Sequence, residues 1–368
     1  MAPGTGLHFD PLRAIPNVAF RDTTWFEAEL DNIWHDDWVF VATEHDLAQP
    51  GDQLPVMVGR QPVLVLRNES GELVAVSNLC AHRGTLLVEE STNAKRIQCP
   101  YHAWTYADSG RLLSVPFSPK GEIDKAEHCL PTYRVESWHG LIFVSLNPDI
   151  EPLTDRFAAV DAVLGDHEPA VDTLHHWPPQ EEPEIWNCNW KLAMFNAMES
   201  YHLFHVHPET LEPYTPTKDA YYISGSARST ATANPGNDGS LSILISLPPN
   251  FVGVLGSYGL IWLAVDPLAT DRCLIRTGAA FTSAPPDPDA GRLKKMVSGA
   301  ASAAYAMAVP DFLPEDRAIC ERGQRGAAGD YRPGRLLDVE RVVIDFGHYL
   351  AWRLHGTEPP PPFTNPDA

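Results

Sequence analysis

Four residues with metal-binding side chains stand in two short, similar segments of the chain. Cys80 and His82 flank one residue in CAHRG, and Cys99 and His102 flank two residues in CPYHAW. Both segments lie beside runs that are typical of β-hairpins, so the four side chains are expected on loops at hairpin ends, where they can converge. Two thiolates and two imidazoles in this arrangement predict a metal site.

The way the ligands are shared between the segments narrows the kind of metal site. Zinc sites of this composition usually take both cysteines from one segment and both histidines from another. Here each segment supplies one of each, which is what a Rieske [2Fe–2S] cluster requires, since one iron takes two thiolates and the other two imidazoles. A structural zinc site and a chance arrangement among 15 histidines and 6 cysteines are the alternatives.

A second group of possible ligands lies in NWKLAMFNAMESYHLFHVHPE. His202 and His207 are five positions apart, about 500° of rotation on a regular helix, so the helix must distort or end between them, as Val206 and Pro208 permit. Two imidazoles and one carboxylate form the facial triad of a mononuclear non-haem Fe(II) site, which leaves positions for O2 and substrate. His205 is the competing ligand because it shares a helix face with His202. A helix end with satisfied histidines is the structural alternative.

The first half of the chain has the pattern of a helix followed by hairpins. TTWFEAELDNIW predicts a helix, with Thr24 and Glu27 fitting a capping box at its start. Residues 38–147 are expected to form an all-β module. Its three hairpins are PVLVLRN with ELVAVSN; RIQCPYHAWTYADSGRLLSV, turning at Asp108-Ser109-Gly110; and TYRVESWHGLIFVSLN, turning near His139-Gly140.

From about residue 150 the pattern is mixed and predicts an α+β domain. NWKLAMFNAMESYHLFHVH is expected to be helical as far as the histidines, and GLIWLAVDP and RCLIRTGAAF are expected to form an antiparallel pair. RLKKMVSGAASAAYAMAV, EDRAICERGQ and DVERVVIDFGHYLAWRL are expected to be helical. The last of these should bury one face, made of Val339, Val342, Val343, Phe346 and Leu350.

Composition limits the class of protein and its partners. The chain has 368 residues, long enough for two domains, with 44% hydrophobic and 20% charged residues. It has no apolar run long enough to span a membrane and no secretory signal pattern, which predicts a cytoplasmic protein. A net charge of −21 disfavours nucleic acid and anionic membranes as partners. In a reducing compartment the six cysteines are not a disulfide framework.

These motifs resemble those of Rieske non-haem iron oxygenases, in the α (terminal oxygenase) subunit. CAHRG and CPYHAW are similar to the family's C-x-H-R-G and C-P-Y-H-G-W, with Ala103 in the place of the usual glycine. Respiratory Rieske proteins carry an extra cysteine in each loop, where this chain has Thr85 and Tyr101, and without that disulfide a lower reduction potential is expected. The segments around His202 and PEDRAICERGQRG also resemble the family's motifs, so the likeness covers nearly the whole chain.

The resemblance assigns roles to individual residues. It implies that His202, His207 and Asp316 bind the mononuclear iron, with Glu315 as the near alternative to Asp316. It implies that Glu199 links His102 of one subunit to His202 of its neighbour, and it places Asn196 in the same catalytic motif. A glutamate at the place of Glu199 occurs in several branches, including oxygenases of quaternary ammonium compounds such as carnitine or betaine.

The resemblance also implies a domain organisation. Residues 1–37 would be a helical segment that packs with the catalytic domain, residues 38–147 the Rieske [2Fe–2S] domain, and residues 148–368 the catalytic domain. The catalytic domain would have a helix-grip fold of the START type, an α+β fold in which an antiparallel sheet covers the iron. The head-to-tail bridging implies a ring-shaped homotrimer.

The function that follows is O2-dependent monooxygenation of a small organic substrate, by hydroxylation or by N- or O-dealkylation. Electrons would come from NAD(P)H through a separate reductase, with or without a ferredoxin. The substrate would be a quaternary ammonium or N-alkyl compound, or an aromatic compound that is hydroxylated or dihydroxylated. Phe204, Tyr221, Tyr222, Phe251 and Trp262 are candidates for an aromatic pocket wall or for the core. A Rieske electron carrier or redox sensor without oxygenase activity is the alternative.

Overall fold

The computed structural model describes residues 8–119, 121–165, 167, 170–178, 182–257, 259–282 and 312–365. The chain divides into two compact units, one of Leu30–Leu153 and one of Met1–Glu29 with Thr154–Ala368, and each is described by itself. The helix predicted over residues 292–309 lies outside the described residues. None of the helices in the described part of the chain has the length and apolarity that a membrane span requires.

The unit of residues 30–153 is built on a seven-stranded antiparallel sheet. Its strand order is β1-β10-β9-β4-β3-β2-β5. The strands are β1 (Val39–Thr43), β2 (Asp52–Val58), β3 (Gln61–Arg67), β4 (Leu73–Ser77), β5 (Thr92–Asn93), β9 (Thr132–Trp138) and β10 (Leu141–Ser145). The predicted hairpins β3–β4 and β9–β10 are confirmed as antiparallel neighbours in register. The second turns at His139 and Gly140, both with positive φ.

A smaller three-stranded sheet carries one of the two Cys/His segments. It consists of β6 (Ile97–Gln98), β7 (Thr105–Tyr106) and β8 (Leu112–Ser114), so the loop of Cys99 and His102 joins β6 to β7. The predicted turn at residues 108–110 is confirmed, with Gly110 at φ 78°. A buried apolar cluster that includes Leu64, Val76, Cys80, Cys99 and Trp104 packs the two sheets of this unit together.

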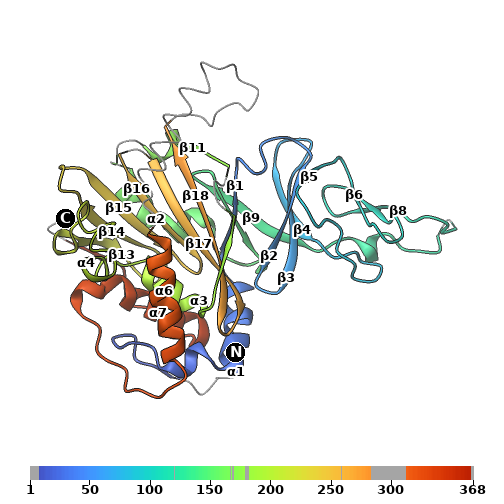
Figure 1. Ribbon diagram of the computed structural model, residues 1–368. Helices are drawn as coiled ribbons and strands as arrows, with labels where there is room; N and C mark the ends of the chain where they lie inside the picture. The colour runs from blue at the N-terminus through green and yellow to red at the C-terminus, as the bar shows by residue number, and fades with distance from the viewer. Residues whose placement is uncertain are drawn as a thin grey trace. The chain divides into compact units, whose positions relative to one another are not determined.

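The other unit is built on a long antiparallel sheet with helices against it (Figure 1). The strand order is β11-β18-β17-β16-β15-β14-β13-β19, and β12 pairs with β18. The strands are β11 (His175–His176), β12 (Glu184–Trp186), β13 (Tyr221–Gly225), β14 (Thr230–Pro235), β15 (Leu241–Leu247), β16 (Phe251–Gly256), β17 (Gly259–Ala269), β18 (Arg272–Phe281) and β19 (Phe363–Thr364). The predicted pair β17–β18 is confirmed over its length.

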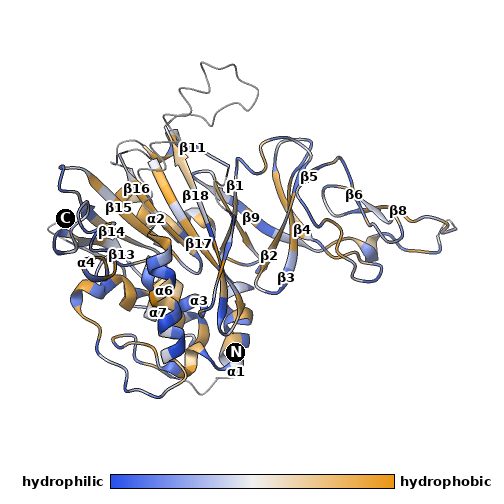
Figure 2. Ribbon diagram, in the orientation of Figure 1, coloured by the Kyte–Doolittle hydropathy of each residue, from blue (hydrophilic) through white to orange (hydrophobic). Residues whose placement is uncertain are grey.

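Helices from three parts of the chain support this sheet. α3 (Trp190–Ala197) packs on β17 and β18 and also against α6 (Leu313–Gly326), while α7 (Arg341–His355) packs on β13 and β14. α7 shows both hydrophobic and hydrophilic residues (Figure 2). The other helices in the described residues are α1 (Thr23–Glu29), α2 (Leu153–Leu164), α4 (Leu203–Val206), a π-helix (Leu30–Trp34) and 3-10 turns at Asn17–Phe20, Ala126–His128, Val171–Thr173, Thr217–Asp219 and Asp338–Glu340.

Two details of the predicted helices are wrong. Val339 was expected on the buried face of the last helix, but it is 48% exposed because a 3-10 turn precedes α7 and changes the rotation. Thr24 was expected to cap the first helix, but the helix begins at Thr23, and the carboxylate of Asp22 accepts the Trp25 backbone N–H at 2.9 Å. An acid one residue outside the helix therefore serves as the cap.

Within the long-sheet unit, a buried ion pair joins the N-terminal segment to α3. Lys191 Nζ on α3 lies 2.5 Å from Glu29 Oε1 at the end of α1, and both side chains are fully buried. The indole N–H of Trp190 donates to the other oxygen of Glu29 at 2.8 Å. Burial raises the pKa of Glu29 and lowers that of Lys191, whereas their mutual attraction opposes both shifts.

Candidate functional site

Three of the residues chosen from the sequence converge at one point of the long-sheet unit. One ligand atom each from His202, His207 and Asp316 lies within 4.8 Å of the others. His207 is completely buried and Asp316 nearly so. Because two imidazoles and a carboxylate are a common set for a mononuclear Fe(II) centre, this group is a candidate metal site.

The local backbone explains how histidines five positions apart can converge. α3 ends at Ala197, and residues 198–202 form a break before the one-turn helix α4. His202 lies just before α4 and His207 just after it, with His207 at φ −117° and ψ 45°. The helix predicted to run as far as the histidines therefore ends earlier. The expected interruption between the two ligands is present, because α4 ends at Val206.

A carboxylate lies within hydrogen-bond distance of Nδ1 of each histidine, the ring nitrogen that points away from Asp316. Oε1 of Glu199 lies 2.7 Å from Nδ1 of His202, and Oε2 of Glu315 lies 2.6 Å from Nδ1 of His207. A carboxylate only accepts, so the proton of each pair lies on Nδ1. This leaves Nε2 of each ring turned toward the third member, Asp316.

One oxygen of Asp316 is the centre of the group. Its Oδ1 accepts from the Asn196 amide at 2.6 Å and lies 2.8 Å from Nε2 of His207 and 3.4 Å from Nε2 of His202. Burial lowers the pKa of His202, but hydrogen bonds with Asp316 and Glu199 outweigh it and raise that pKa to about 9. The carboxylates therefore stabilise positive charge between the rings, so the chemistry of the donor set fits a metal cation.

The alternative ligands lie elsewhere. His205 is exposed and its ring contacts that of Phe204. Glu315 contacts Nδ1 of His207 rather than the centre of the group. The structure therefore brings together His202, His207 and Asp316, and it gives Glu315 a different place from the one that the sequence left open.

The two Cys/His segments form similar tight loops in the other unit. In the first, the Cys80 N–H donates to the Thr85 carbonyl, and the Gly84 N–H donates to the Cys80 carbonyl, each at 2.8 Å. In the second, the Cys99 N–H donates to the Trp104 carbonyl at 2.8 Å, and the Ala103 N–H donates to the Cys99 carbonyl at 3.0 Å. The two cysteines are 3% exposed each.

Positive φ angles explain why glycine is usual at one of these places. Gly84 has φ 71° and Ala103 has φ 55°, both in the left-handed region. Glycine adopts this region freely, whereas the Cβ of alanine is crowded there. The substitution of Ala103 for the usual glycine therefore stores backbone strain in the loop of Cys99 and His102.

The histidine side chains of these two loops lie close together. The rings of His82 and His102 lie 4.9 Å apart, and His82 stacks on Trp104 at 4.7 Å. Nδ1 of His102 is buried and has no hydrogen-bond partner within the described part of the chain. A buried nitrogen without a partner is costly unless it binds something, so this atom fits a metal ligand.

Sequence reasoning missed Tyr106, which contacts the same group. Its hydroxyl lies 3.3 Å from Sγ of Cys80 and accepts the Ala81 N–H at 3.2 Å. Burial and the neighbouring thiol raise the pKa of Tyr106, so its hydroxyl keeps its proton. The available signal was the spacing of Trp104, just before β7, and Tyr106 within it, because residues two apart in an extended segment lie on the same side, and both rings are buried.

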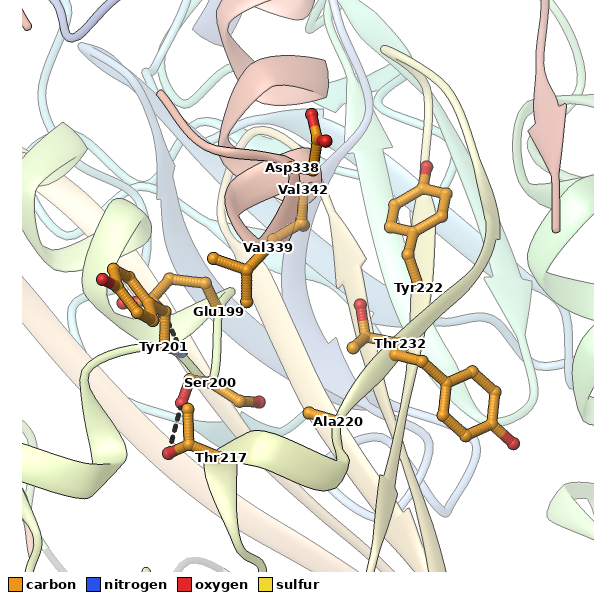
Figure 3. Close-up of a pocket in the computed structure, with 11 residues that line it drawn as sticks. Glu199, Ser200, Tyr201, Thr217, Ala220, Tyr222, Thr232, Asp338, Val339 and Val342 are labelled. Atoms are coloured by element: carbon orange, nitrogen blue, oxygen red, sulfur yellow. Dashed lines mark hydrogen bonds between the residues drawn. The ribbon is translucent and has the colours of Figure 1, made fainter. Parts of the chain in front are cut away.

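Two cavities lie beside the segment that carries Glu199 and His202. One of about 220 Å³ is lined by Glu199, Ser200, Tyr201, the strand residues Tyr221 and Tyr222, and residues before and within α7, among them Asp338 and Val342 (Figure 3). The other, of about 380 Å³, includes Asn196, Glu199, Phe195 and Cys320. Of the other aromatic candidates for a pocket wall, Phe251 and Trp262 are buried in the sheet and Phe204 is exposed.

Comparisons with known proteins cover both units. A family model described as "Rieske [2Fe-2S] domain" matches residues 37–134, and one described as "Ring hydroxylating alpha subunit (catalytic domain)" matches residues 173–356. The first domain followed by the second confirms the predicted fold class, an all-β Rieske domain followed by an α+β catalytic domain.

Curated relatives and solved structures extend these matches. The chain is 32% identical over 199 residues to the large subunit of 2-halobenzoate 1,2-dioxygenase from Burkholderia cepacia, covering 51% of this chain and 42% of that protein. It is 31% identical over 199 residues to the oxygenase subunit of glycine betaine monooxygenase from Chromohalobacter salexigens, covering 54% and 44%. The matched part thus spans about half the length of these relatives. The quaternary ammonium Rieske monooxygenase CntA superposes with a TM-score of 0.78 at 22% identity, over 94% of this chain and 97% of that one, which shows a shared fold.

Proposed function

We propose, from the premise that this chain belongs to the ring hydroxylating alpha subunit family and carries a Rieske [2Fe–2S] domain, that it is the terminal oxygenase of an electron-transfer system. Two iron cofactors come with this family and domain, a Rieske [2Fe–2S] cluster and a mononuclear iron that uses O2. The proposed reaction is the O2-dependent oxidation of a small organic substrate.

The ligands of the cluster are proposed to be Cys80 and Cys99 on one iron and His82 and His102 on the other. This assignment is supported by the burial of both thiols and by Nδ1 of His102, which has no hydrogen-bond partner among the residues that the structure describes. The hydroxyl of Tyr106 would donate to the Cys80 sulfur and so stabilise the extra negative charge of the reduced cluster.

The single observation that carries the proposal is the convergence of His202, His207 and Asp316 in a chain with a Rieske domain. We propose these three as the ligands of the mononuclear iron. When bound there, the iron supplies the activation of O2. A carrier or sensor without this iron would have no need for a buried carboxylate between two imidazoles, so the oxygenase function is preferred.

Glu199 and Asn196 are proposed to act around this centre. Glu199 keeps the proton of His202 on Nδ1, and Asn196 fixes the orientation of the Asp316 carboxylate. We further propose that Glu199 is approached by His102 of a neighbouring subunit in a homotrimer. The cavity of about 220 Å³ beside Glu199 supports such an approach, because it opens next to the carboxylate.

The electron donor is proposed to be a separate NAD(P)H-dependent reductase, with or without a ferredoxin. The substrate is proposed to be either a quaternary ammonium or N-alkyl compound, which would be hydroxylated or dealkylated, or an aromatic compound. The names of the relatives support both classes, since one is a glycine betaine monooxygenase and another a 2-halobenzoate dioxygenase. Monooxygenation is our preferred reaction.

The proposal is tested by metal analysis, spectroscopy and turnover of the purified protein. We expect about three iron atoms per chain, two in the cluster and one in the mononuclear site, with a Rieske EPR signal after reduction. With a reductase, ¹⁸O2 and a panel of betaines, N-methyl amines and benzoates, one substrate should gain labelled oxygen or lose a labelled methyl fragment.

Variants of the proposed ligands provide the controls. Asp316→Ala should remove the third iron and the turnover while the Rieske signal persists, and Cys80→Ser should remove the signal. Two iron atoms in the wild-type protein after anaerobic iron loading, with a normal Rieske signal, would favour the electron carrier instead. Zinc in place of iron, with no visible absorption after iron supplementation, would contradict both functions.

A further inference from the structure

The imidazole of His207 is held between two adjacent acids of α6. Nε2 lies 2.8 Å from Oδ1 of Asp316, and Nδ1 lies 2.6 Å from Oε2 of Glu315. The two acids are in the first turn of α6, and they reach opposite sides of the same ring. One helical turn therefore fixes both the position and the rotation of His207.

A threonine near His207 completes this arrangement. The hydroxyl of Thr210 donates to Oε2 of Glu315 at 2.6 Å and lies 3.4 Å from Nδ1 of His207. Thr210 is three residues after His207, so the segment that carries the histidine also donates a hydrogen bond to Glu315, the acid that contacts its ring.

We propose that Glu315, oriented by Thr210, is a positioning residue for His207: it keeps the proton on Nδ1 and turns Nε2 toward the metal, and it is not itself a ligand. This inference rests on the proposed function, because it assumes a metal at the centre of His202, His207 and Asp316. Glu199 does the same for His202, so each ligand histidine has its own carboxylate. The two adjacent acids thus have different roles: Glu315 contacts Nδ1 of the His207 ring, and Asp316 lies at Nε2 on the side of the metal site.

The difference in burial between the two acids supports this division. The side chain of His207 is completely buried and that of Asp316 is 9% exposed, whereas that of Glu315 is 36% exposed. Glu315 therefore reaches His207 from the solvent side. Its removal should leave the three proposed ligands in place but free the His207 ring to rotate, which weakens metal binding without abolishing it.

The test is equilibrium dialysis of the full-length protein against Co²⁺ after the mononuclear site has been emptied with a chelator. Cobalt is counted separately from cluster iron, and the EPR spectrum of bound high-spin Co²⁺ reports the ligand geometry. Glu315→Ala should weaken Co²⁺ binding by about 10- to 100-fold and broaden the spectrum, as is typical when a carboxylate behind a ligand histidine is lost. Glu315→Gln should be intermediate, since its amide oxygen still accepts from Nδ1 but carries no charge. Thr210→Val should show a smaller loss in the same direction.

The matched control is Glu209→Ala, which removes an exposed glutamate two residues from His207 and should bind Co²⁺ as the wild type does. Wild-type affinity and spectrum in Glu315→Ala and Glu315→Gln would overturn the positioning role. Complete loss of Co²⁺ in Glu315→Gln, equal to that of Asp316→Asn, would instead make Glu315 a ligand and also overturn it. If the wild type binds no Co²⁺ at this site, the metal centre and hence the proposed function fail.

Discussion

The side-chain amide of Asn196 donates a 2.6 Å hydrogen bond to Oδ1 of Asp316, although 120 positions separate the two residues. Asn196 lies in the last turn of α3 and Asp316 in the first turn of α6. The bond therefore links the two helices that carry or precede the proposed ligands, and it fixes which carboxylate oxygen faces the histidines.

Replacing Asn196 should loosen the carboxylate without removing a ligand. For Asn196→Ala we expect about 10-fold or greater loss of turnover together with faster loss of the mononuclear iron to a chelator, because the orientation of Asp316 is no longer fixed. Iron content after timed chelation is the measurement. Asn237→Ala removes an exposed amide whose hydrogen bond lies outside the centre, and it should retain iron as the wild type does. Equal retention in both variants would contradict this role of Asn196.

The strain at Ala103 predicts that glycine stabilises the Rieske domain. With φ at 55°, Ala103→Gly should stabilise the loop by about 1 kcal/mol, since the left-handed conformation costs a residue with a Cβ about 1–2 kcal/mol and glycine loses part of this gain through its greater entropy when unfolded. The temperature at which the cluster absorbance disappears should rise by a few degrees. Ala107→Gly, at a buried alanine without a positive φ, should lower it. A lower temperature in Ala103→Gly would contradict the strain.

The hydroxyl of Tyr106 should tune the cluster potential. Tyr106→Phe removes a hydrogen bond to the Cys80 sulfur, so the reduced cluster loses stabilisation and its potential should fall. A net hydrogen bond of about 1 kcal/mol corresponds to a few tens of millivolts in a one-electron couple. Protein-film voltammetry measures the shift. The control is Tyr133→Phe, because the hydroxyl of Tyr133 interacts with Ser77 and not with a proposed cluster ligand. This variant should leave the potential unchanged. A similar fall in both variants would count against a specific role of Tyr106.

The buried pair of Glu29 and Lys191 predicts a large effect from a single substitution. Lys191→Met leaves a buried carboxylate without its partner and should cost about 3–5 kcal/mol of unfolding free energy. The double variant Glu29→Gln/Lys191→Met should recover much of this loss, because the glutamine oxygen still accepts from Trp190 and no charge remains. Denaturant unfolding followed by circular dichroism is the measurement.

The pH dependence of Lys191→Met gives a second check on the same pair. Without Lys191, burial holds the folded-state pKa of Glu29 above its unfolded value, so the folded state takes up a proton more readily. The relative stability of the variant should therefore be greatest at low pH and fall as the pH rises through the folded pKa. A defect that does not change with pH would contradict a buried unpaired carboxylate.

Local sequence patterns were sufficient for much of the architecture. The strands β3, β4, β9 and β10 were predictable because their apolar runs are separated by turns with a positive-φ glycine, Gly71 or Gly140. The strands β17 and β18 were predictable from their apolar runs alone. The start of α1 was misplaced by reading a threonine as the cap when Asp22 was equally suitable. The exposure of Val339 could not be foreseen, because Val339 lies in the 3-10 turn Asp338–Glu340, where the rotation per residue differs from that of α7.

The candidate site was predictable in its composition but less so in its contacts. The types and spacing of His202 and His207 indicated a metal site, and the acid on α6 came from resemblance to a family motif. The hydrogen bond between Glu315 and His207 joins residues 108 positions apart, so its existence depends on how α6 packs beside α4. The contact of Tyr106 with Cys80 depends in the same way on the pairing of two loops.

The single turn of α4 has a consequence for how this segment can be altered. Only four residues, Leu203 to Val206, separate His202 from His207, and the N–H of His207 donates back to the Leu203 carbonyl at 2.9 Å. One inserted or deleted residue would rotate His207 by about 100° and take it away from Asp316. Phe204 and His205, by contrast, face solvent. A fluorophore or spin label attached at either position would therefore sit within one helical turn of both proposed ligands and report on the iron centre from outside it.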